Sequence, residues 1–125
     1  MPRTRTLTAA FGVSRLIFGA GLVALPDQLG SRWLGDDAGR APVKIALRAL
    51  GARDVALSAG TLAALRRRDG IELWLAGAIV SDLCDVVSTL ATPGDALPGN
   101  ARWGTAALGG GSALAGAALL AAGSR

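Results

Sequence analysis

The chain has 125 residues, enough for one domain, and 51% of them are apolar while only 4% are aromatic. One cysteine and no histidine exclude an internal disulfide framework and the usual zinc or haem ligand sets, so we expect no metal and no cofactor. The formal net charge of +4 does not indicate nucleic-acid binding, because no basic stripe with interleaved aromatic residues is present.

Four apolar stretches, each close to the ~20 residues that cross a bilayer, follow one another along the chain. They cover residues 7–25, 43–65, 73–91 and 103–122. Proline and glycine mark nearly every boundary between them, as is typical of helix ends. The 18 glycines and the many alanines suit membrane helices, which pack through small residues. The sequence therefore predicts an all-α fold: a single domain over residues 1–125 that forms a four-helix transmembrane bundle with short loops.

The first stretch also has the basic start of a cleaved signal peptide, in Arg3 and Arg5. Arg15 interrupts its apolar region, however, and no small-x-small cleavage site precedes Pro26. We therefore expect a retained span.

The basic residues outside the spans predict the orientation of the bundle. Arg3 and Arg5 precede the first span and Arg66–Arg68 follow the second, whereas the loop at residues 26–42 carries both signs. The positive-inside rule places both termini and the arginine run in the cytoplasm, with the chain in the cytoplasmic membrane. Trp33, Trp74 and Trp103 fall near predicted span ends, as an interfacial aromatic belt requires.

Six ionisable side chains lie inside the predicted spans, and their signs cancel. They are Arg15, Arg48, Arg53, Asp54, Asp82 and Asp85. A charge at the bilayer centre costs about 2.5–3.5 kcal/mol, so the second and third spans do not insert without partners. We therefore expect these residues to meet inside the bundle. Their depths along the helices predict one pair between Arg48 and Asp85. They also predict that Arg15 and Arg53 pair with Asp54 and Asp82.

This buried network has two interpretations. It is a structural device that fixes helix register, or it lines a proton path, a solute path or a polar head-group pocket. An enzyme is not expected, because carboxylates neutralised by arginines are poor proton donors and the chain has no Tyr and only one Glu. Cys84 lies in apolar sequence beside two aspartates, which predicts a small buried packing residue.

Small residues recur at four-residue spacing on the second and fourth spans. These stripes are Ala52, Ala56, Gly60 and Ala64, and Thr105, Gly109, Ala113, Ala117 and Ala121. They predict close packing of the second span on the fourth, or of two copies of the chain in a homo-oligomer.

One motif joins the second and third spans: Arg48-x-x-Gly51-Ala52-Arg53-Asp54, followed by Asp82-x-x-Asp85. With it the chain resembles a family of small bacterial four-helix membrane proteins that carries a domain of unknown function and is common in actinobacteria. The resemblance covers nearly the whole chain. It implies a four-span integral membrane protein and supplies no activity.

Three functional classes remain open. The first is a non-enzymatic accessory, lipid-binding or assembly component, with membrane lipids as its partners. The second is a small oligomeric transporter or proton-coupled carrier that uses Asp82 and Asp85. The third is a water-soluble helical bundle.

Overall fold

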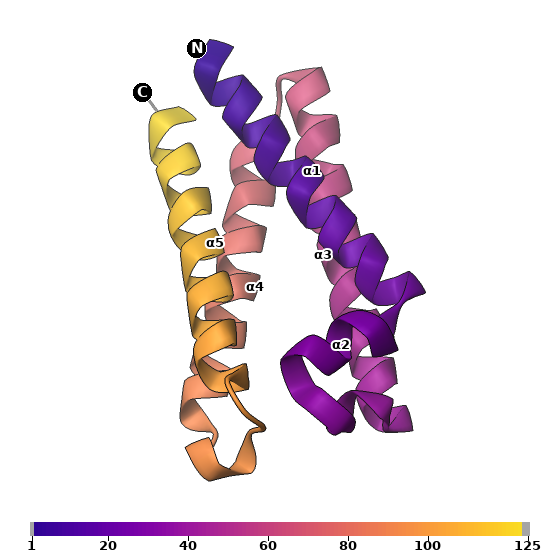
Figure 1. The fold of residues 1–125 in the computed structure, drawn as a ribbon. Coiled ribbons are helices and arrows are strands. Elements are labelled where there is room, and N and C mark those ends of the chain that lie inside the picture. Colours follow the sequence, from indigo (N-terminus) through magenta and orange to yellow (C-terminus); the bar gives the residue numbers. More distant parts are fainter. Residues whose placement is uncertain (1, 124–125) are drawn as a thin grey trace.

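The computed structural model describes residues 2–123, and all of their regular structure is helical (Figure 1). The five α-helices are α1 (Pro2–Ala24), α2 (Pro26–Leu34), α3 (Ala41–Arg67), α4 (Ile71–Ala91) and α5 (Ala101–Gly123). Two short 3-10 turns, η1 (Gly35–Gly39) and η2 (Gly94–Ala96), lie in the connections. The all-helical prediction is confirmed, whereas the number of α-helices within residues 2–123 is five rather than four. Helices α1, α3, α4 and α5 coincide with the four predicted spans.

Helix α2 replaces part of the loop expected between the first two spans. Proline is tolerated at the first helical position, so Pro26 ends α1 and begins α2. Leu29 and Trp33 are four residues apart and therefore share one face of α2. That face packs on a small core formed by Leu22 and Leu47. The apolar spacing within residues 26–34 was the sequence signal for this helix.

The helices form two close pairs, α1 with α3 and α4 with α5 (Figure 1). Glycines permit the first contact: a Cβ on Gly19 would lie 2.6 Å from the backbone oxygen of Gly51. In the second pair, Gly109 faces Val86 and Gly116 faces Ile79. Backbones approach this closely only where side chains are absent.

The predicted packing of the second span on the fourth within one chain is therefore wrong. Part of the small-residue stripe of α5 packs on α4, where Gly109 contacts Val86. On α3, Ala52 and Ala56 remain exposed, and the ring of Trp74 covers Gly60. The stripes predicted small-residue contacts, but the glycines of α1 decided which helix lies against α3.

Three helices, α1, α4 and α5, are long and apolar enough to cross a membrane. Less than a third of the apolar stretch in each of them is buried inside the molecule. Helix α3 does not join them by composition, because Arg48, Arg53 and Asp54 lie within it.

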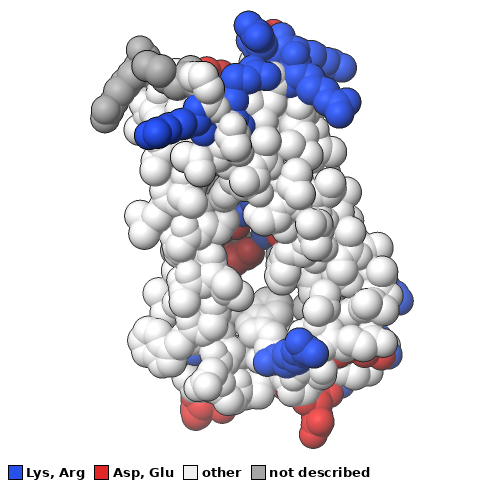
Figure 2. Space-filling model, turned by 45° about the horizontal axis from the view of Figure 1, so that its top comes forward, with Lys and Arg blue, Asp and Glu red and all other residues white. Residues whose placement is uncertain are grey.

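Helix α1 begins, and α5 ends, at the end of the molecule where α3 turns into α4 (Figure 1). Arg3, Arg5 and Arg66–Arg68 therefore share this end, which we call the basic end. Figure 2 shows basic side chains gathered there, which are arginines because the only lysine, Lys44, lies near the start of α3, and a mixture of both signs at the opposite end.

Candidate functional site

Arg15 of α1 lies at the centre of a buried ion cluster. Its Nη1 donates a hydrogen bond to Asp82 Oδ2 on α4 over 2.5 Å, and its Nη2 donates to Asp54 Oδ1 on α3 over 3.0 Å. The same Nη1 donates to Ser112 Oγ on α5 over 2.7 Å. Arg15, Asp54 and Asp82 are all buried. One guanidinium therefore joins α1 to three other helices and connects the two helix pairs.

Arg53 on α3 forms the second half of the cluster. Its Nη1 and Nη2 donate to the two carboxylate oxygens of Asp85 on α4, over 3.0 and 2.7 Å. Its Nε and Nη2 also donate to Asp54 Oδ1, over 3.4 and 3.3 Å. The two-point contact with Asp85 is the geometry in which arginine binds a carboxylate most strongly. Asp54 is thus shared between Arg15 and Arg53.

Arg48 lies outside the cluster, so the predicted pair of Arg48 with Asp85 is wrong. Its side chain is exposed, and its Nε donates to the backbone oxygen of Val23 over 3.3 Å. The last carbonyl groups of a helix have no partner within it, and α1 ends at Ala24, one residue after Val23. Arg48 satisfies one of these carbonyls, which leaves Asp85 to Arg53. Arg15 and Arg53 were predicted to pair with Asp54 and Asp82. In the structure Arg15 pairs with both aspartates, and Arg53 pairs with Asp54.

Because Arg48 lies outside the cluster, the positive and negative charges of the site are unequal in number. Two guanidinium groups face three carboxylates, so the cluster carries a net charge of −1 when all five groups are ionised. Asp54 accepts hydrogen bonds only at Oδ1 and Asp82 only at Oδ2. One oxygen of each carboxylate is therefore without a hydrogen bond from residues 2–123. The expected cancellation of signs does not hold.

A cavity of about 290 Å³ opens over this cluster. Its walls are largely apolar and come from α1, α2, α3 and α5, including Phe18, Trp33, Leu50 and Leu108. Figure 2 shows such a hollow in a nearly uncharged face, with acidic and basic atoms at its floor. A second cavity, of about 550 Å³, shares Phe18, Trp33 and Leu108 with the first and reaches the loop before α5.

Trp33 positions α2 beside these cavities. Its Nε1 donates a hydrogen bond to Thr105 Oγ1 on α5 over 2.9 Å. Trp33 is half-buried, and an indole N–H that is shielded from water is costly without such a partner. The sequence predicted a position for Trp33 at the membrane interface. The structure adds a hydrogen bond to Thr105 that joins α2 to α5.

Cys84 is exposed, so its prediction as a buried packing residue is wrong. On α4 the inward face is occupied by Ala78 and Asp82, and Cys84 lies two residues beyond Asp82, on a different face. The exposed side chains of Val80, Leu83 and Val87 surround it in sequence.

No known protein family, curated protein or solved structure matches this chain. The resemblance to small four-helix membrane proteins stays a prediction carried by its motif residues. Function must therefore be inferred from the geometry of the site.

The geometry allows two kinds of chemistry. The cluster can hold two helix pairs in one register, and its unbalanced carboxylates can take up a proton or a cation from the cavity. Among residues 2–123, no grouping of three or more His, Cys, Asp or Glu side chains is placed to hold a metal ion.

Proposed function

We propose that this protein is a four-span integral protein of the cytoplasmic membrane, with both termini in the cytoplasm, that acts as a non-enzymatic lipid-binding or assembly component. The observation that carries the proposal is an inverted distribution of polarity. Arg15 is 8% exposed, whereas Ile17, two residues away on the same helix, is 68% exposed. Leu108 and Leu114 on α5 are 72% and 74% exposed. Apolar surface outside and charge inside suit a protein surrounded by hydrocarbon.

Helix α3 is the fourth span in this proposal. Its charged residues Arg53 and Asp54 are engaged by partners on α1 and α4, so they need not face lipid. Arg48 lies within two turns of the start of α3, where a long side chain reaches the interface. The basic end supports a cytoplasmic position for the termini, because the positive-inside rule counts arginines in short segments next to spans.

Within the bundle, the ion cluster acts as the register device that locks the two helix pairs together. A buried charge pair contributes little net stability, but breaking one is costly, so it selects one arrangement of helices. Exposed small residues on α3 and α5, such as Ala56 and Ala117, supply surfaces for contact with a second copy or a larger membrane assembly.

Reporter fusions test this proposal directly. We expect reporters placed after residues 68 and 123 to be cytoplasmic and those after residues 39 and 97 to be external. The protein should stay in the membrane fraction during alkaline carbonate extraction. Recovery in the soluble fraction, or reporters at residues 39 and 68 on the same side, would contradict the four-span topology.

A second function, that of a proton-coupled carrier, is favoured by one observation. The cluster has one carboxylate more than it has guanidinium groups and forms the floor of a cavity that shares lining residues with a second one, so a proton or a small cation has both a binding site and a route. Asp85→Asn removes the excess charge at a half-exposed position, and Asp82→Asn does so at a buried one. Loss of pH-dependent flux in proteoliposomes, by variants that insert and fold normally, would favour the carrier. Misassembly of both variants would favour the structural role.

A further inference from the structure

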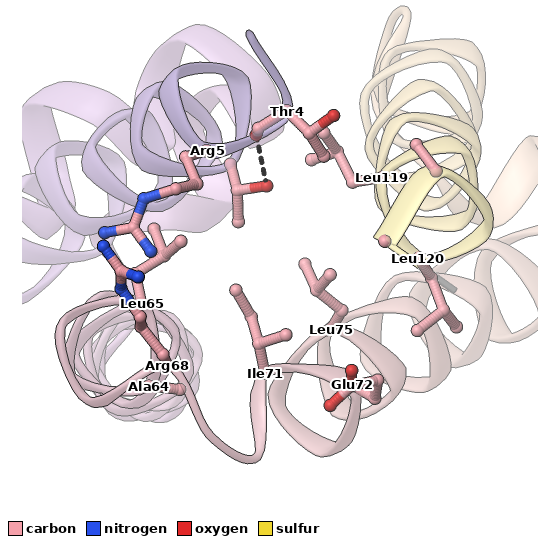
Figure 3. Close-up of a pocket in the computed structure, with 13 residues that line it drawn as sticks. Thr4, Arg5, Ala64, Leu65, Arg68, Ile71, Glu72, Leu75, Leu119 and Leu120 are labelled. Atoms are coloured by element: carbon pink, nitrogen blue, oxygen red, sulfur yellow. Dashed lines mark hydrogen bonds between the residues drawn. The ribbon is translucent and has the colours of Figure 1, made fainter. Parts of the chain in front are cut away.

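A separate cavity, of about 390 Å³, lies at the basic end, between the start of α1, the α3–α4 turn and the end of α5 (Figure 3). It is remote from the ion cluster and shares no lining residue with the cavity of about 290 Å³ that opens over the cluster. Apolar side chains form most of its wall. They include Ala64, Leu65, Ile71, Leu75, Leu119 and Leu120.

Two arginines, Arg5 and Arg68, line this apolar cavity. Figure 3 shows Arg5 and Arg68 on one side of it and Glu72 at a separate point of the rim. Neither arginine forms an ion pair with any residue from 2 to 123, and Glu72 forms none either. Two unpaired guanidinium groups at one edge attract an anion.

The backbone at Arg68 adopts a conformation that is unfavourable for a residue with a side chain. Arg68 adopts a left-handed conformation with φ of 59°, and its N–H donates to the backbone oxygen of Ala64 at the end of α3. This position favours glycine, and Arg68 is the only non-glycine residue with positive φ among residues 2–123. This conformation ends α3 after Arg67 and leaves the Arg68 side chain in the lining of the cavity.

We propose that this cavity binds one anionic glycerophospholipid of the inner leaflet. Arg5 and Arg68 hold its phosphate, and one acyl chain enters the wall of leucines. Guanidinium groups bind phosphate oxygens with paired hydrogen bonds. The apolar wall can also bury an acyl chain, which a lipid has and inorganic phosphate does not. The carboxylate of Glu72 accepts hydrogen bonds, and the hydroxyl groups of a glycerol headgroup can donate them. A headgroup without donors, such as choline, cannot make this contact and is disfavoured. This proposal rests on the membrane location proposed above.

The test uses the full chain in nanodiscs and in detergent, with phosphatidylglycerol and phosphatidylcholine as probes. Wild-type protein should retain phosphatidylglycerol in preference to phosphatidylcholine, measured by native mass spectrometry. Arg68→Gly should weaken this retention about tenfold, as expected for the loss of one charge-assisted contact, while leaving the fold intact because glycine suits the left-handed position. Arg5→Gln should have a similar effect.

Arg66→Gln is the matched control, because Arg66 is exposed, belongs to the same arginine run and does not line the cavity. Equal loss of lipid in Arg66→Gln and Arg68→Gly would overturn the proposal in favour of diffuse surface charge. Competition by inorganic phosphate as strong as by lipid would also overturn it, since the acyl chain would then contribute nothing. An inserted protein with the expected reporter topology but no lipid preference refutes this inference alone. A soluble protein refutes the membrane location first.

Discussion

Arg15 Nη1 on α1 and Asp82 Oδ2 on α4 lie 2.5 Å apart, although 67 positions separate the two residues in the sequence. Arg15 is the only partner of Asp82 among the ion pairs of residues 2–123, whereas Asp54 is held by two arginines. Within residues 2–123, Arg15 with Asp82 and Arg53 with Asp85 are the two ion-pair connections between the helix pairs, and the more deeply buried one, at Arg15, gives the first prediction.

Arg15→Met should destabilise the protein by about 3–5 kcal/mol, because it leaves the buried carboxylate of Asp82 without a partner. The double variant Arg15→Met/Asp82→Leu should recover most of that loss, since it removes both charges. Unfolding in mild detergent titrated with denaturing detergent measures both values. A cost below about 1 kcal/mol for Arg15→Met would contradict the buried pair.

Arg48 and Arg53 should respond differently to the same substitution. Arg48→Gln removes one exposed contact with the backbone oxygen of Val23, so we expect a loss of at most about 1 kcal/mol. Arg53→Gln removes the two-point contact with Asp85 and the contact with Asp54, for an expected loss of at least about 2 kcal/mol. The same unfolding titration compares them. A larger loss for Arg48→Gln would restore the pairing expected from depth alone.

Gly19→Ala should cost about 1–3 kcal/mol, because the new Cβ would meet the backbone of α3 at Gly51 and the two helices would have to separate. Gly110→Ala is the matched control: Gly110 also lies in a helix, and a Cβ at this position would point into open space. It should be neutral or stabilising by up to about 1 kcal/mol. Thermal unfolding in detergent distinguishes the two, and equal effects would contradict the close α1–α3 contact.

Cys84 reports on the surroundings of α4, because it is the only cysteine in the chain and its side chain is exposed. In native membranes we expect little reaction with a charged thiol reagent, since hydrocarbon disfavours both the reagent and the thiolate. Labelling should become complete after denaturation. Fast labelling by the charged reagent in intact membranes would place this face of α4 in water.

Local pattern was sufficient to predict the long helices and the residue types of the cluster. Apolar runs bounded by proline located α1, α3, α4 and α5, and charges inside such runs identified Arg15, Arg53, Asp54, Asp82 and Asp85. Depth along a helix was a poorer guide to pairing, because it fixes the height of a residue but not which face of its helix meets a neighbour.

The sequence by itself determined that the chain is helical, that its surface is apolar and that its buried charges require one another, because these properties follow from residue type and spacing along one helix. Only the tertiary structure decided that Arg15 joins α3 to α4, that Arg48 caps α1 and leaves one carboxylate in excess, and that α2 folds against the cavity. Those outcomes depend on which helices approach closely enough, and the glycines at the α1–α3 crossing set that approach through contacts between residues far apart in the chain.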